Sequence, residues 1–157
     1  MIKKVLVSQP APATDKSPYH DIAQNFGVEF TFQPFVKVEG LEAREFRSQK
    51  VNILDHTAIV FNSRNAIEHF FHLCKELRVT LPEDMKYFGI SEKVILYIQK
   101  FVQYRKRKVF FGSSGHWPEL LTVMAKHKTE KYLFPLSEGT SLEIAGQLDQ
   151  KKIKHTE

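Results

Sequence analysis

From residue 53 onward, short apolar segments alternate with helical patterns in a regular order. Four successive units each contain an apolar strand, a polar turn that includes serine, and an amphipathic helix. In the first unit, ILDHTAIVF is followed by NSRN and by AIEHFFHLCKEL, whose Ile67, Phe70 and Cys74 fall at helical offsets. The other strands are KYFGI, KVFFG and KYLFPL, and the last helix carries Thr140 and Glu143 in capping-box spacing. This alternation predicts consecutive β-α units.

The first 50 residues carry a different pattern. A short strand is predicted over residues 3–7, and a helix over residues 19–26 is expected to stop at the glycine that follows it. Residues 28–38, VEFTFQPFVKV, alternate apolar and polar positions and predict a strand that bends at its proline. Residues 41–50 are expected to form a polar helix with a thin apolar stripe.

Strands that alternate with helices of this length predict an α/β fold, a parallel sheet flanked by helices. In such sheets ligands bind beyond the carboxyl ends of the strands, where helix amino termini present unpaired N–H groups and partial positive charge. Serine and asparagine are also the usual helix N-caps, so the ordinary interpretation of any single turn is capping. Serine turns recur after successive strands along one edge of the sheet, and this makes capping alone a weaker explanation without excluding it. The candidate binding residues are Ser8, Asn62, Ser63, Arg64, Ser91, Ser113, Ser114 and Ser137.

Composition places the chain among soluble globular proteins, because 157 residues that are 42% hydrophobic and 26% charged suffice for one domain, or one domain and part of another. The net charge of +5 suits an anionic partner but does not choose among nucleic acid, phosphate and polycarboxylate. Cys74 is the single cysteine, so no internal disulfide forms. The sequence has no signal-peptide pattern and no apolar run near the roughly 20 residues of a membrane span. We therefore expect a cytoplasmic protein that does not enter the membrane.

Familiar nucleotide and metal motifs are missing from the sequence. Neither a G-x-G-x-x-G after a strand nor a G-x-x-x-x-G-K-[ST] occurs, so a Rossmann site or a P-loop has no support. His69 and His72 stand three apart without a third metal ligand, and Cys74 lies on an apolar stripe, so we interpret them as surface or packing residues. The basic run YRKRK, residues 104–108, precedes a strand and is interpreted as a solvated loop at the opposite edge rather than a nucleic-acid contact. No catalytic residue can be assigned from spacing.

Several motifs, in this order and spacing, resemble the uroporphyrinogen-III synthase family. The chain begins with the lysine-bearing strand KKVLVSQP, and PFVKVE at residues 34–39 matches the family's P-x-x-x-V/F-E segment. The turn FNSRNA at residues 61–66 matches F-[TN]-S-x-x-A, and FGISE at residues 88–92 corresponds to the family's strand-Gly-x-x-Thr turn. The late strand and helix correspond to YLFPLSEGTSLEIAGQL. The resemblance extends over the whole chain.

The resemblance implies an enzyme, a lyase of haem biosynthesis. Such enzymes close the linear tetrapyrrole hydroxymethylbilane into uroporphyrinogen III, with loss of water and inversion of the last pyrrole ring, and need no metal or other cofactor. The implied fold has two α/β domains. Residues 1–38 would begin a discontinuous first domain, and residues 39–157 would form the second. We expect Ser63 with Asn62, together with Ser91 and Ser113, to contact substrate carboxylates, because dispersed donors suit a flexible polycarboxylate.

Two departures from the family pattern lead to further expectations. Glu92 stands where the family has threonine, and its charge would repel a substrate carboxylate unless the side chain points away or is protonated. Family members continue well beyond Glu157, where the tyrosine often proposed as proton donor would lie. The chain therefore looks truncated, and an incomplete gene model and a form completed by a partner are also open. The strands of residues 4–7 and 28–38 would then lack neighbours and invite self-association through their edges. The alternative function is a non-catalytic module that binds a tetrapyrrole or another anion.

Overall fold

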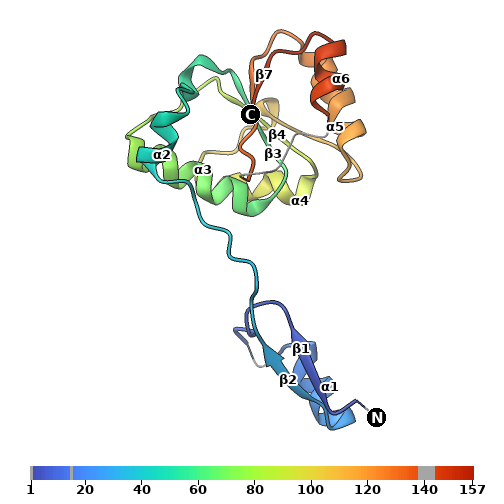
Figure 1. Cartoon of the computed structure of the whole chain (residues 1–157). Coiled ribbons are helices and arrows are strands. Elements are labelled where there is room, and N and C mark those ends of the chain that lie inside the picture. Colours follow the sequence, from blue (N-terminus) through green and yellow to red (C-terminus); the bar gives the residue numbers. More distant parts are fainter. Residues whose placement is uncertain (1, 15, 138–143) are drawn as a thin grey trace. The chain divides into compact units, whose positions relative to one another are not determined.

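The computed structural model describes residues 2–14, 16–137 and 144–157 (Figure 1). The chain divides into two compact units, Met1–Glu39 and Gly40–Glu157. Each unit has its own sheet, so each is described by itself.

The first unit contains two parallel strands and one helix. Strand β1 (Lys4–Val7) pairs with β2 (Glu29–Phe32), and α1 (Pro18–Phe26) connects them. The predicted strand of residues 28–38 is wrong beyond Phe32. The last bond to β1 is donated by the Gln33 N–H, and the proline that follows has no N–H to continue the ladder.

Burial in the first unit is shallow. None of its described residues, 2–14 and 16–39, is buried. The ring of Tyr19 meets Phe30 and Phe32 edge-on, with centroids 5.3 and 5.2 Å away. Phe26 and Phe35 remain 67% and 66% exposed. A sheet of two strands with one helix offers too little surface to form a core.

The second unit contains a five-stranded sheet in the order β5-β4-β3-β6-β7, with every neighbouring pair parallel. None of the helices in the described part is both long and apolar enough to cross a membrane. Its elements in chain order are α2 (Ala43–Ser48), η1 (Ile53–Asp55), β3 (Ala58–Phe61), α3 (Arg64–Leu77), β4 (Lys86–Gly89), α4 (Glu92–Ile95), η2 (Leu96–Lys100), η3 (Lys106–Lys108), β5 (Val109–Phe111), α5 (Trp117–Met124), η4 (Ala125–His127), β6 (Tyr132–Leu133), α6 (Ala145–Gln150) and β7 (His155–Thr156).

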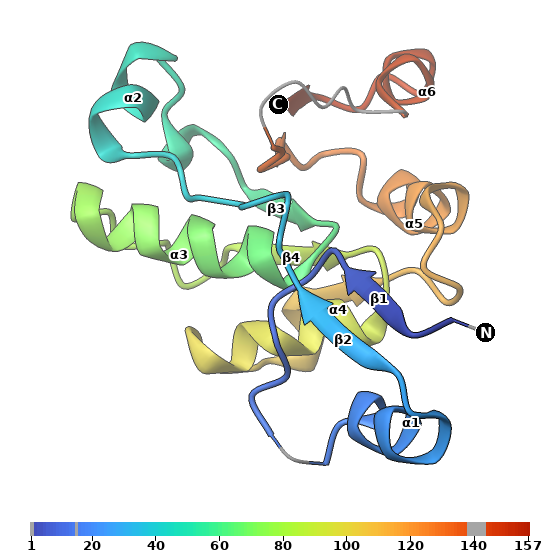
Figure 2. The same ribbon diagram turned by 60° about the horizontal axis from the view of Figure 1, so that its bottom comes forward.

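The sheet is covered on both faces, as the sequence predicted for parallel β-α units. Figure 2 shows α2, α3 and α4 on one side of β3 and β4, with α5 and α6 on the other. Alternate residues of β3 serve the two faces. Ile59 and Phe61 belong to the core under α3, and Ala58 and Val60 to the core under α5 and α6. All four residues of β3 are buried, which explains why the central strand reads as a continuous apolar run.

Several element boundaries differ from the sequence prediction. Ile53–Asp55 forms a 3-10 turn rather than strand, because the Asn52 side chain accepts the Leu54 N–H at 3.1 Å and caps the turn. The helix that was predicted after β4 is a single α-helical turn, α4, and it continues as the 3-10 segment η2. Strand β7 was not predicted, since two residues are too few to show an alternation. Thr140 and Glu143, the predicted capping box, lie outside the described residues.

Candidate functional site

Four of the predicted serine turns leave the same edge of the five-stranded sheet. The strands are parallel, so the segments that follow them emerge together at their carboxyl ends. In the spatial order of the sheet, these segments carry Ser113 after β5, Ser91 after β4, Ser63 after β3 and Ser137 after β6. We call this the carboxyl edge. Ser8 follows β1 and belongs to the other unit.

The chain reverses its winding at β3. From β3 it moves outward through β4 to β5, and it then returns to place β6 on the opposite side of β3. The helix after β3 packs on one face of the sheet and the helix after β6 on the other. In open α/β sheets such a switch point is where ligands bind. The turn of Asn62, Ser63 and Arg64 stands at this switch point.

Ser63 is the N-cap of α3, the longest helix of the described chain. Its Oγ accepts a hydrogen bond from the Ala66 N–H at 3.1 Å. The hydroxyl proton is not used by this bond and can still be donated, as can the first N–H groups of the helix, which have no intrahelical acceptor. Asn62 beside it is half-buried. The Ser63 turn therefore combines capping with free donor capacity.

Arg64 turns away along the neighbouring β-α connection. Its Nη2 donates to the carbonyl oxygen of Lys93 at 3.5 Å, and its guanidinium lies 5.7 Å from the ring centroid of Tyr97. These contacts hold the side chain against α4 and η2. A direct bond from Arg64 to a ligand at the switch point stays a prediction.

Ser91 begins α4 without a capping bond from its side chain. Its carbonyl accepts the Ile95 N–H at 3.0 Å, which starts the helix, while its hydroxyl keeps its bonding capacity. The close approach of α4 to the end of β4 depends on Gly89, because a Cβ there would lie 2.4 Å from Cβ of Ile95. Glu92, the acid that replaces the family's threonine, is exposed in the first turn of α4.

The turn of Ser113 and Ser114 already holds a carboxylate of its own chain. The Ser113 hydroxyl and the Ser114 N–H donate to Oε2 of Glu119, at 2.8 and 2.6 Å. Hydrogen bonds from Ser114 and Ser113 hold the pKa of Glu119 below its usual range. The sequence analysis missed Glu119. Two serines followed by an acid in the first turn of the next helix is a pattern that indicates this hydrogen bonding. The turn is thus built to bind a carboxylate.

The remaining polar candidates lie apart from this edge or at its margin. Ser137 is exposed after β6, directly before residues outside the description. Cys74 is buried as predicted, and burial raises the pKa of its thiol to about 12, which keeps it protonated. His72 lies 3.3 Å from Glu76, and His69 packs against Gly40. In the described ranges no three His, Cys, Asp or Glu residues gather as metal ligands.

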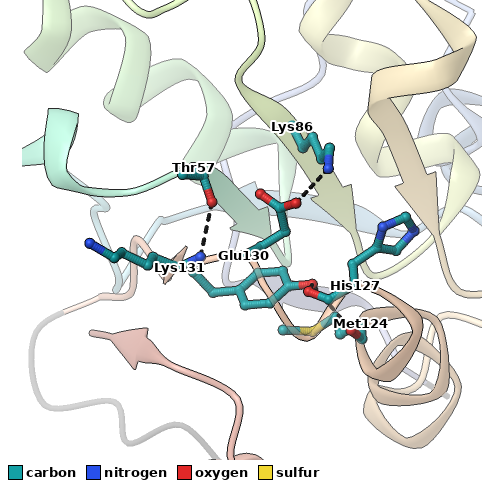
Figure 3. Close-up of polar contacts among 7 residues, drawn as sticks. Thr57, Lys86, Met124, His127, Glu130 and Lys131 are labelled. Carbon is teal, nitrogen blue, oxygen red and sulfur yellow. Dashed lines mark hydrogen bonds and ion pairs between the residues drawn. The ribbon is translucent and has the colours of Figure 1, made fainter.

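The opposite, amino edge of the sheet carries a cluster that the sequence did not reveal (Figure 3). Nζ of Lys86, at the start of β4, lies 2.5 Å from Oε1 of Glu130, which precedes β6. The Thr57 hydroxyl accepts the Lys131 N–H at 2.9 Å. The hydroxyl of Tyr132 donates to the carbonyls of Met124 and His127 at 3.2 and 3.1 Å. These groups bind one another and join β3, β4 and β6.

Fold and edge together define a doubly wound α/β domain with serine turns along its carboxyl edge, one of them at the switch point. The family model described as uroporphyrinogen-III synthase HemD matches residues 17–157. The chain belongs to the uroporphyrinogen-III synthase family, and the resemblance seen in the sequence is confirmed.

A solved structure shares the fold. The crystal structure of a mutant uroporphyrinogen III synthase from the extremely thermophilic bacterium Thermus thermophilus superposes with a TM-score of 0.65 at 13% sequence identity. The match covers 99% of this chain and 60% of that one, so the chain spans 60% of the length of that protein. No curated protein sequence matches the chain.

Proposed function

We propose that the protein acts in tetrapyrrole biosynthesis as a uroporphyrinogen-III synthase, a lyase that closes hydroxymethylbilane with inversion of its last pyrrole ring and loss of water. The observation that carries the proposal is the row of serine turns along the carboxyl edge of a doubly wound sheet, in a chain of this family. The substrate is a chain of four pyrroles with carboxylate side arms, and these turns offer donors at several separate points.

The chemistry follows from how these donors act. A linear tetrapyrrole must bring its two ends together before the ring closes, and holding several carboxylates at once makes that approach effectively intramolecular. Ser63 with Asn62 would hold one carboxylate at the switch point. Ser91 and the Ser113–Ser114 turn would hold others further along the edge. A carboxylate that enters the last of these turns has to displace Glu119.

The isomer of the product tests the proposal. Hydroxymethylbilane that closes without inversion gives the type I isomer, so the ratio of type III to type I uroporphyrin after oxidation measures the enzyme. We expect the protein to give mainly type III. The double variant Ser63→Ala with Ser91→Ala should lose roughly a hundredfold or more in kcat/KM, since each removed donor to a charged group is worth about 1.5–3 kcal/mol.

A matched control is Thr129→Ala, which removes an exposed hydroxyl before Glu130, at the amino edge. This variant should keep the parent rate and isomer ratio. An isomer ratio that stays at type I in the presence of the protein would rule the activity out.

A second candidate is a non-catalytic module that binds a tetrapyrrole or another polycarboxylate. It is favoured by the contact of Ser113, whose hydroxyl donates to the carboxylate of Glu119 and so holds an acid rather than moving a proton. Titration with uroporphyrin III separates the two candidates. Saturable binding together with an unchanged isomer ratio would select the module, and the Ser63→Ala and Ser91→Ala pair should weaken that binding.

A further inference from the structure

A recess lies at the amino edge of the five-stranded sheet, away from the serine turns. It has a volume of about 480 Å³, within the range of small-molecule sites. Its walls come from the carboxyl end of α3, the segment that leads into β4, and the segment of residues 102–108 that leads into β5. All of these residues belong to the second unit. The proposed synthase function does not use this recess.

The floor of the recess is aromatic. The rings of Phe71 and Phe101 are stacked with centroids 4.8 Å apart and planes inclined by 2°. Phe101 is nevertheless 40% exposed, so one ring of the stack stays open to solvent. Tyr87 and Ile98 also line the recess. An open aromatic surface of this kind favours a flat apolar partner.

The polar atoms of the floor are uncharged. Burial raises the pKa of Tyr87 to about 12, so its phenol keeps its proton at neutral pH. The thiol of Cys74, which lines the same recess, is also protonated. The floor thus presents no charge to a bound molecule.

The mouth of the recess carries an excess of positive charge. Glu83 forms an ion pair with Arg105, and both line the recess. Arg105, Lys108 and Arg107 together hold the pKa of Glu83 below its usual range, which places three cations around one carboxylate. Lys75 adds a further cation to the lining. The mouth therefore attracts an anionic group.

We propose that this recess binds a small amphipathic anion, with a flat aromatic body on Phe101 and Tyr87 and a carboxylate beside Arg105 and Lys108. Charge complementarity at the mouth and an aromatic floor both specify this class of ligand. The site also gives a role to the basic run YRKRK. A strand of nucleic acid would use the exposed charges of that run but not the aromatic floor, which distinguishes the two partners.

The test uses 1-naphthoate as a probe of the 157-residue chain. We expect saturable binding with a Kd on the order of 100 µM, given the small number of atoms in the probe. Backbone amide shifts followed by NMR should change around Phe71, Thr80, Phe101 and Lys108. The uncharged analogue 1-naphthamide should bind roughly tenfold more weakly, because it lacks the charge-assisted bonds.

Two variants examine the mouth and the floor separately. Arg105→Gln with Lys108→Gln should weaken naphthoate binding about tenfold, whereas the charge-matched control Lys126→Gln with Lys128→Gln should leave it within about twofold. Thr80→Trp places a large ring at an exposed lining position and should block the recess without removing a buried side chain. Circular dichroism checks that each variant is folded.

Several results would overturn the proposal. These are the lack of saturable binding by the parent chain, equal binding of naphthamide, shifts confined to another part of the chain, or naphthoate binding that Thr80→Trp leaves intact. Binding of a short oligonucleotide that is weakened by the double charge variant but not by Thr80→Trp would instead assign the basic run to nucleic acid.

Discussion

At the amino edge of the five-stranded sheet Lys86 and Glu130 bind each other. At the carboxyl edge Ser63 caps α3 and Ser91 makes no capping bond, and both hydroxyls can still donate. Both edges are polar. The amino edge satisfies its groups with partners on other strands, and so it joins β4 to β6. The carboxyl edge satisfies its groups locally, within single turns. A surface that must accept a ligand cannot bind all its donors to itself. We infer that the Lys86–Glu130 pair holds strands together, whereas the serine turns of the carboxyl edge leave donors for a ligand.

The largest expected effect concerns the close approach of α4 at the carboxyl edge. Gly89→Ala should destabilise the protein by about 3 kcal/mol, because its Cβ would lie 2.4 Å from Cβ of Ile95 in a buried position. Gly146→Ala is the matched control, since nothing lies within 4 Å of a Cβ there and alanine favours helix α6. Urea unfolding should show a lower unfolding free energy for Gly89→Ala. For Gly146→Ala the unfolding free energy should be unchanged or slightly higher. Equal midpoints would contradict the packing argument.

The next effect concerns the buried end of the amino edge. Tyr132→Phe should cost about 1–2 kcal/mol of unfolding free energy, because the carbonyls of Met124, which is buried, and His127, which is partly buried, lose a donor at 3.2 and 3.1 Å. The control Tyr104→Phe, at a side chain that is 37% exposed, should change the unfolding free energy by no more than about 0.5 kcal/mol. The Tyr132 variant should also keep the isomer ratio of the parent. A changed ratio with unchanged stability would mean that the amino edge takes part in function.

A smaller effect distinguishes two serines of the carboxyl edge. Ser63→Ala should cost about 1 kcal/mol because it removes the bond to the Ala66 N–H. Ser91→Ala should cost less, since the Ser91 side chain makes no capping bond. Thermal unfolding of the two variants gives the comparison. Equal losses would show that Ser91 caps α4 in solution and holds no donor in reserve.

The smallest effect is the pH dependence of the Lys86–Glu130 pair. Partial burial acts to raise the pKa of Glu130, but hydrogen bonds from Lys86 and Thr57 and the charge of Lys86 outweigh it, so this pKa lies below the ordinary 4.5. The pair therefore stabilises the fold fully above pH 4.5 and loses its contribution as pH falls through the lowered folded-state pKa. Glu130→Gln should remove about 1 kcal/mol at pH 7 and less at pH 3. If the stability difference between Glu130→Gln and the parent grew as the pH fell, the predicted pH dependence would be wrong.

The sequence predicted much of the second unit because its signals are local. The apolar run of β3 and the helical spacing of Phe70 and Cys74 follow from neighbouring residues alone, and the structure places both as expected. The order of the strands in the sheet could not be predicted from such local signals. Five parallel strands can be arranged in several orders, and contacts between distant segments choose among them.

Contacts between distant residues account for what the sequence left open. Lys86 and Glu130 are 44 positions apart, so no spacing connects them. The guanidinium of Arg64 donates to the carbonyl of Lys93, 29 positions away, a contact that no spacing indicates. The predicted strand at residues 53–55 became a 3-10 turn because the Asn52 side chain captured a backbone N–H. Strand β7 exists only because β6 offers it an edge.

By itself, the sequence determined the α/β class, the serine turns and the family, because periodicity, helix caps and motif order are written along the chain. Only the tertiary structure decided which turn stands at the switch point, that Glu119 fills the turn of Ser113 and Ser114, and that basic residues lie beside an aromatic floor at the opposite edge. These features depend on how separate segments pack, and packing is fixed by contacts in space rather than by spacing along the chain.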